Sequence, residues 1–152
     1  MPPRWASYPA ALRARQWNYR QMIEYRDNQP LEPLEVARVF EASGISRPTK
    51  DIPRIAQMFA NASVVISAWD GARLVGVSRA LTDYSYCCYL SDLAVDVAYQ
   101  KQGIGRELIR RTQSIIGEEV SLILMSPPGA MAYYPKVGFS LADNAYVIRR
   151  KR

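Results

Sequence analysis

The stretch LSDLAVDVAYQKQGIGRELIRR, residues 90–111, decides the fold. Its first part, up to Val95, has the apolar character of a β-strand, and its last part, from Gly103, carries apolar residues at helical spacing. A short basic and polar loop joins the two. Gly103 and Gly105 lack a Cβ atom, so a ligand can approach the backbone amides closely, and the start of a helix attracts anions. The order of strand, loop and helix therefore predicts a site for a pyrophosphate.

Other phosphate-binding motifs fit this stretch less well. A Walker A loop requires G-x-x-x-x-G-K-[ST], which the chain lacks. A dinucleotide-binding fingerprint requires a third glycine or alanine, and Leu108 stands at that position. The alternative interpretation of this stretch is the start of a helix with two flexible glycines that binds no ligand.

Outward from this stretch, the apolar pattern predicts one α/β domain with a mixed α+β sheet. The order βαα-βββ-α-β-α-β is typical of a central, mostly antiparallel sheet flanked by helices. Residues 1–20 combine prolines with arginines and have a weak helical pattern, which predicts a basic N-terminal extension to a domain of residues 21–152. The predicted strands cover 21–26, 63–68, 74–81, 84–95, 120–125 and 145–149, and the predicted helices 32–42, 50–60, 103–116 and 130–136.

Composition excludes several classes of protein. The chain has 152 residues, of which 49% are hydrophobic and 22% charged, as expected of one globular domain. The absence of histidine excludes Ser-His-Asp and Cys-His catalysis and most zinc sites, and without a dense acidic cluster we expect no metal. No apolar stretch reaches the ~20 residues that span a bilayer, so we expect no membrane contact. Adjacent Cys87 and Cys88 do not suit an intrachain disulfide, which favours a cytoplasmic, reducing location.

The positive charge lies near the two ends of the chain. The net charge is +6, with four arginines before residue 21 and four basic residues at 149–152, so the part between them is slightly acidic. Charge in such segments is typical of solvated tails, and we do not expect a nucleic-acid partner.

Two motifs resemble those of the GNAT superfamily of N-acetyltransferases. Gln100 to Gly105 has the Q/R-x-x-G-x-G/A form of that family's acetyl-CoA loop, after a strand that ends Leu-Ala-Val. About thirty residues later, AMAYYPKVGF (130–139) is similar to the family segment A-x-x-x-Y-x-x-x-G-F. With the element order, the resemblance extends from about residue 22 to 148. The chain departs from it at Pro127, where many relatives carry an asparagine that contacts pantetheine; Ser126 is left to supply that contact.

The resemblance implies an enzyme that transfers an acetyl group from acetyl-CoA to a primary amine by direct attack in a ternary complex. The acceptor is a small-molecule or protein amine whose identity stays open. The oligomeric state also stays open, with a homodimer as one alternative. A non-catalytic acyl-CoA-binding or sensing module on the same fold is the alternative from another class.

The resemblance also implies roles for single residues. Tyr134 is the expected general acid, whereas adjacent Tyr133 is expected in the core. From its own position, Asp92, which strand alternation places on the face opposite Ser91 and Leu93, is either a base acting through water or a residue that orients the loop. Tyr89, Glu24 and Glu35 are further candidates for the base. The expected acetyl-CoA-binding residues are Leu93, Ala94, Val95, Gln100, Lys101, Gln102, Gly103, Ile104, Gly105, Arg106, Ser126, Ala130 and Tyr134.

Overall fold

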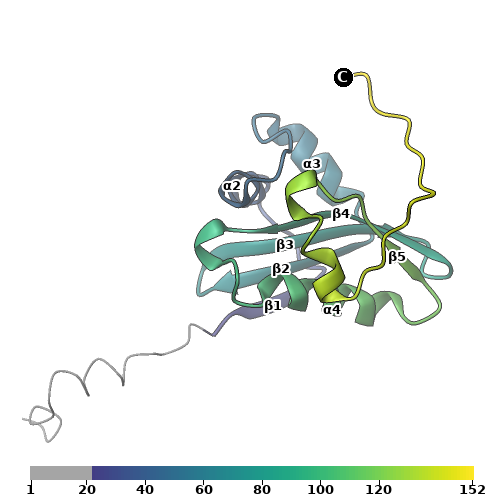
Figure 1. The fold of residues 1–152 in the computed structure, drawn as a ribbon. Coiled ribbons are helices and arrows are strands. Elements are labelled where there is room, and N and C mark those ends of the chain that lie inside the picture. Colours follow the sequence, from purple (N-terminus) through teal and green to yellow (C-terminus); the bar gives the residue numbers. More distant parts are fainter. Residues whose placement is uncertain (1–21) are drawn as a thin grey trace, which may run out of the picture.

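The computed structural model describes residues 22–152, so the predicted extension at 1–20 lies outside the described residues. Five strands form one sheet in the order β1-β2-β3-β4-β5 (Figure 1). Every neighbouring pair is antiparallel except β4 and β5, which are parallel. This confirms the mixed, mostly antiparallel sheet. The strands are β1 (Glu24–Asp27), β2 (Val64–Asp70), β3 (Arg73–Thr82), β4 (Cys87–Val95) and β5 (Ser121–Ile123).

Helices cover both faces of the sheet. In Figure 1, α2 (Pro33–Ser43) and α3 (Ile52–Ala60) lie on one face, and α4 (Ile104–Ile116) lies on the other. A proline in the first turn begins α2, and Gly44 ends it with a left-handed φ of +81°. The Asp51 carboxylate begins α3 by accepting a hydrogen bond from the Arg54 amide. Within residues 22–152, no helix has the length and apolar character needed to cross a membrane.

Two apolar cores lie on opposite faces of the sheet. Strand β2 contributes to both, because Val65 packs toward α2 and α3, whereas Val64 and Ile66 pack toward α4. A strand covered on both faces has no polar side to its alternation, which explains the continuous apolar run in this part of the sequence.

Strand β4 contains a β-bulge at Ser91. Asp92 lies opposite Arg79 of β3, and Leu90 lies opposite Ala80, so Ser91 is an extra residue without a partner. An extra residue interrupts the alternation of side chains. As a result Ser91 and Asp92 both contact the guanidinium of Arg79, and the expectation that they point to opposite faces is wrong.

The chain after β5 differs from the prediction. Two 3₁₀ turns, Pro128–Ala130 and Tyr134–Val137, replace the helix expected over 130–136, because Pro135 has no N–H group to continue an α-helix. The strand expected over 145–149 does not form either, and residues 139–152 have no regular secondary structure. A strand requires a partner edge, and this segment pairs with none among the described residues.

Candidate functional site

The predicted site opens where β4 and β5 separate. The two strands pair only through residues 87–89 of β4 and 121–123 of β5, whereas β4 continues beside β3 as far as Val95. Among residues 22–152, residues 90–95 therefore have no strand neighbour on the β5 side. Leu93, Ala94 and Val95 lie on this edge, as the sequence predicts, and their backbone groups can face a ligand.

The loop from β4 to α4 ends in a helix start with unpaired amides. Lys101 and Gly103 have positive φ angles of +63° and +86°. The Gly103 carbonyl accepts the first hydrogen bond of α4, from the Glu107 amide at 3.1 Å. The amides of residues 104–106 have no acceptor among the described residues. Unpaired amides at the positive end of a helix dipole attract an anion, and a pyrophosphate matches them.

Gly105 lies close to the Tyr133 side chain. A Cβ atom at this position would lie 2.7 Å from the Tyr133 hydroxyl, inside van der Waals contact. Tyr133 itself is 36% exposed and lies against the start of α4, so the expectation that it belongs to the core is wrong. The reason is that the chain turns into a 3₁₀ turn at Tyr134, so Tyr133 does not follow the pattern of an α-helix.

Side-chain hydrogen bonds connect the loop with the second motif. Arg106 Nη2 donates to the Lys136 carbonyl at 3.1 Å, which links α4 to the turn that carries Tyr134. The side-chain amide of Gln100 folds back, and its Nε2 donates to the Val95 carbonyl at 2.9 Å. Ser126 Oγ donates to the Pro127 carbonyl at 2.8 Å, and Lys101 and Gln102 are exposed. The two motifs are therefore adjacent, although they are about thirty residues apart in sequence.

Tyr134 lies half-buried in an aromatic group. Its ring packs edge-on against Tyr133 and Phe139, with centroid separations of 5.3 and 5.6 Å. Burial raises the pKa of Tyr134, Tyr133 raises it further, and the Arg47 guanidinium lowers it. A phenol with a raised pKa keeps its proton at neutral pH, which suits a proton donor.

Asp92 is fully buried between two arginines. Arg47 Nε donates to Oδ1 at 2.5 Å, and Arg79 Nε donates to Oδ2 at 2.5 Å. Arg47 comes from the connection between α2 and α3, and its Nη2 also donates to the Ser91 carbonyl at 2.6 Å. A guanidinium therefore occupies each carboxylate oxygen of Asp92. This geometry favours the expected orienting role over the expected base role.

The two arginines were not predicted as site residues. Arg79 lies in an apolar strand, and a buried charge requires a partner, so its presence was a signal for a nearby acid. Nothing in the sequence indicates that Arg47 meets the same acid, because the two lie 45 residues apart. Two guanidiniums share one carboxylate, so this cluster of Arg47, Arg79 and Asp92 has a net positive charge.

Comparison with known proteins defines the class of this fold and site. A family model described as an acetyltransferase (GNAT) domain matches residues 36–148. The chain therefore belongs to the GNAT acetyltransferase family.

Relatives and solved structures agree with this family. The chain is 28% identical over 129 residues to an uncharacterized N-acetyltransferase, ycf52, from Pyropia yezoensis, covering 77% of this chain and 72% of the relative. Its fold is similar to that of a probable acetyltransferase of unknown function from Staphylococcus aureus, with a TM-score of 0.75 at 22% identity over 86% of this chain and 100% of the other. It is also similar to an aminoglycoside N-acetyltransferase, AAC(6')-Iy, in complex with CoA, with a TM-score of 0.65 at 12% identity over 86% and 95% of the two chains.

Proposed function

We propose that this chain transfers an acetyl group from acetyl-CoA to a primary amine by direct attack in a ternary complex. One observation carries the proposal. The free edge of β4 leads through a short loop to the unpaired amides at the start of α4, and the hydrogen bond from Arg106 to the Lys136 carbonyl joins α4 to the turn that carries the phenol of Tyr134. The β4 edge suits the thioester of acetyl-CoA, the amides suit its pyrophosphate, and the phenol suits its leaving thiolate.

The described residues fit acetyl-CoA. The amides of residues 104–106 and the side chain of Lys101 offer hydrogen-bond donors and positive charge to a pyrophosphate. Backbone groups of residues 93–95 can hold a pantetheine amide as a neighbouring strand would. Pro127 has no backbone N–H, so Ser126 is the polar side chain left for the arm beside Ala130.

Acetyl-CoA, when bound, supplies an activated thioester. An N–H of the β4 edge can donate to the carbonyl oxygen as negative charge develops on it. As the amine nitrogen bonds to the acetyl carbon and the C–S bond breaks, Tyr134 Oη would give its proton to the departing sulfur, and the phenolate would take back the proton that the attacking nitrogen releases. A thiol has a pKa of ~8.5 and a phenol one of ~10. Protonation of the departing thiolate needs only a modest acid, and a phenol within hydrogen-bond reach can serve as that acid.

The positive cluster of Arg47, Arg79 and Asp92 joins the connection between α2 and α3 to the β4 bulge, and we propose that the amine is held beside it. An amine attacks only in its neutral form, and a net positive charge nearby disfavours the ammonium. Asp92 acts as a positioning residue here, because it holds Arg47 against the β4 bulge. Cys88 is buried and burial raises the pKa of its thiol, which supports direct attack over an acyl-cysteine route.

The test is the Tyr134→Phe variant, which keeps the ring but removes the transferable proton. We expect kcat to fall by roughly 10²–10⁴-fold while acetyl-CoA affinity changes much less. Tyr86→Phe is the matched control, because Tyr86 is 78% exposed and its hydroxyl makes no hydrogen bond to a described residue. Single-turnover transfer at saturating acetyl-CoA and amine separates chemistry from product release.

Two results would contradict the proposal. A wild-type single-turnover rate for Tyr134→Phe would make this residue a packing group. Tight CoA binding by the wild-type protein, without thiol release on any member of an amine library, would favour the binding-module alternative.

A further inference from the structure

Arg47 carries a positive charge that no acid of the described residues balances. It shares the Asp92 carboxylate with Arg79, and neither arginine forms an ion pair with a second acid among residues 22–152. One carboxylate therefore faces two guanidiniums. Arg79 is the more deeply buried of the two, because its side chain is 9% exposed and that of Arg47 is 23% exposed. The unbalanced charge is thus accessible to a ligand at Arg47.

The Arg47 guanidinium also keeps unused hydrogen-bond donors. Its Nε donates to Asp92, Nη1 to the Ser46 carbonyl and Nη2 to the Ser91 carbonyl. Each Nη atom of an arginine bears two N–H groups, so one on each has no acceptor among the described residues. Two N–H groups of a planar guanidinium match the two oxygens of a carboxylate. The bonds to Asp92 and Ser91 already fix the guanidinium, so little freedom is lost when an anion binds.

This guanidinium lies beside the proposed reaction centre. Its bond to the Ser91 carbonyl places it against the stretch of β4 that has no β5 partner among the described residues. It also lowers the pKa of the Tyr134 phenol, so its positive charge acts on the proposed proton donor. An anion bound to Arg47 would therefore hold a neighbouring amine close to the group that protonates the departing sulfur.

An exposed apolar row borders the charged cluster. On β3, Leu81 lies two residues after Arg79, so the two side chains share one face of the sheet. Leu81 pairs with Tyr89 of β4, which in turn pairs with Ile123 of β5. These three side chains are 40%, 41% and 49% exposed. Such a row suits an apolar group that a ligand carries next to its anion.

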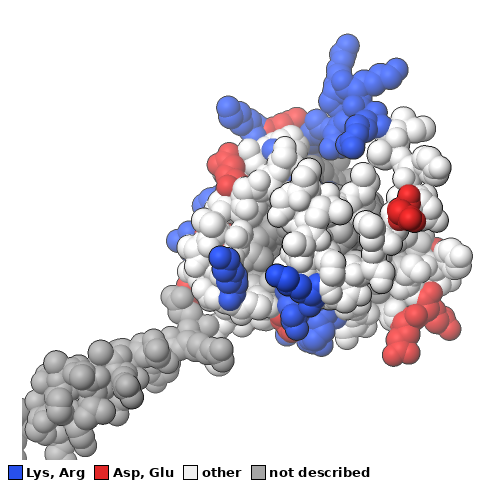
Figure 2. All heavy atoms as spheres, in the orientation of Figure 1, with Lys and Arg blue, Asp and Glu red and all other residues white. Residues whose placement is uncertain are grey.

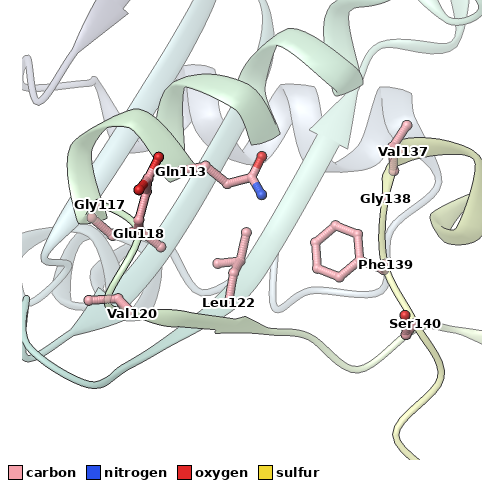
Figure 3. A pocket seen from close by; sticks show the side chains of 10 residues that line it. Gln113, Gly117, Glu118, Val120, Leu122, Val137, Gly138, Phe139 and Ser140 are labelled. Atoms are coloured by element: carbon pink, nitrogen blue, oxygen red, sulfur yellow. The ribbon is translucent and has the colours of Figure 1, made fainter.

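Two other features of the described surface suit a carboxylate less well. Figure 2 shows one face of the molecule, on which the Lys and Arg side chains form separate groups toward the rim. Such exposed charges are solvated and screened, so each attracts an anion only weakly. A cavity of about 520 Å³ lies at the C-terminal end of α4, and Figure 3 shows Leu122 and Phe139 pointing into it. Its lining includes Glu118 and no basic residue, so it does not attract a carboxylate.

We propose that the acceptor is an amino acid with an apolar side chain. Its carboxylate binds the Arg47 guanidinium, its side chain lies along the row of Leu81, Tyr89 and Ile123, and its amine is held near Tyr134. This substrate class rests on the proposed function, because it names the acceptor of the same site. An acceptor with a second ammonium group, such as a polyamine, would instead be repelled by the cluster.

Matched acceptors test the carboxylate without any substitution in the protein. Leucine, leucinamide and glycine are compared at saturating acetyl-CoA and at one pH. We expect kcat/KM for leucine to exceed that for leucinamide by about 10–100-fold, the range for a hydrogen-bonded contact between charged groups. The carboxylate makes the leucine amine more basic, so less of it is neutral, and the preference cannot come from amine reactivity. Leucine should also exceed glycine, which has no side chain to reach the apolar row, and equal values for either pair would overturn the proposal.

Substitution of Arg47 tests whether the preference comes from this residue. In Arg47→Gln, Arg79 still balances Asp92 in a one-to-one pair, so we expect the chain to fold. The ratio of kcat/KM for leucine to that for leucinamide should fall to about 1, and Arg47→Lys, which keeps the charge but lacks the planar fork, should restore part of it. Arg54→Gln is the matched control, because Arg54 is exposed and forms no ion pair with a described residue. An unchanged ratio in Arg47→Gln would refute the assignment of the carboxylate to Arg47.

Product binding distinguishes a wrong substrate class from a wrong reaction. N-acetylleucine and N-acetylleucinamide are titrated into the CoA-loaded protein in a calorimeter. We expect the carboxylate to bind about 10-fold or more tightly than the amide, with the difference lost in Arg47→Gln. If this holds but no amine is acetylated, the carboxylate site stands and the proposed transfer is wrong. If amines are acetylated but the two ligands bind equally or not at all, the transfer stands and the carboxylate site is wrong.

Discussion

The Asp92→Asn variant tests the positioning role that the structure gives to Asp92. The substitution keeps the size of the side chain but removes its charge. It leaves the guanidiniums of Arg47 and Arg79 without a counter-ion, and the side chain of Arg79 is only 9% exposed. The amide nitrogen that replaces one carboxylate oxygen is a donor, and it would face an N–H group of one arginine.

The magnitude follows from this geometry. Removing one partner of a buried ion pair costs about 3–5 kcal/mol, since the remaining charge stays desolvated. For a chain of this size each kcal/mol shifts the melting temperature by about 3–4 °C. We therefore expect Tm to fall by roughly 10–20 °C.

The assay is thermal unfolding by circular dichroism. Glu41→Gln is the matched control, because Glu41 is exposed and forms no ion pair with a described residue. Its Tm should stay within about 2 °C of wild type, as usual for surface substitutions. In a double-mutant cycle with Arg47→Gln, the two stability losses should be strongly non-additive, because the residues share one interaction.

A different outcome would refute the positioning role. If Asp92→Asn melts like the wild type but its rate no longer falls at low pH, Asp92 is a catalytic base and the orienting role is wrong. If Asp92 is a positioning residue, its substitution lowers the stability of the fold, and the rate still falls at low pH.

Three further predictions concern other parts of the chain. Gly105→Val should abolish acetyl-CoA binding in calorimetry while the fold remains, whereas Ser114→Val on the exposed side of α4 should bind normally; undiminished affinity in the glycine variant would exclude the site. Arg110 and Arg111 lower the pKa of Glu107 from 4.5 to about 2 in the folded state, so its stabilising effect is present above about pH 4.5 and is lost as the pH falls toward 2. The Tm difference between wild type and Glu107→Gln should therefore shrink from about pH 6 to about pH 3, and a constant difference would contradict this. Deleting residues 1–20 should leave CoA affinity unchanged, and a folded product that no longer binds CoA would show that the extension takes part in the site.

Local signals in the sequence predicted much of the fold. The helical spacing of residues 104–116 and the apolar runs of the strands identified these elements, because a period of 3.6 or 2 depends on neighbouring residues only. The element boundaries shifted by a few residues. The two predicted motifs proved to lie side by side, joined by the hydrogen bond from Arg106 to the Lys136 carbonyl.

The failures lie where distant contacts decide the conformation. The strand predicted over 145–149 has a strand-forming sequence, but a strand also requires pairing, and in the structure this segment pairs with no sheet edge among the described residues. The bulge at Ser91 reversed the expected side of that residue, because alternation holds only while the register is uninterrupted.

The sequence by itself determined where α4 begins and which glycines stand there, because glycine positions and helical spacing are local properties. Only the tertiary structure brought Arg47 and Arg79 onto the two oxygens of Asp92, and only it ended the pairing of β4 with β5 at Tyr89 and Ile123. The physical reason is that a buried charge must find its counter-ion wherever the packed chain places one, and the sequence does not specify that distance.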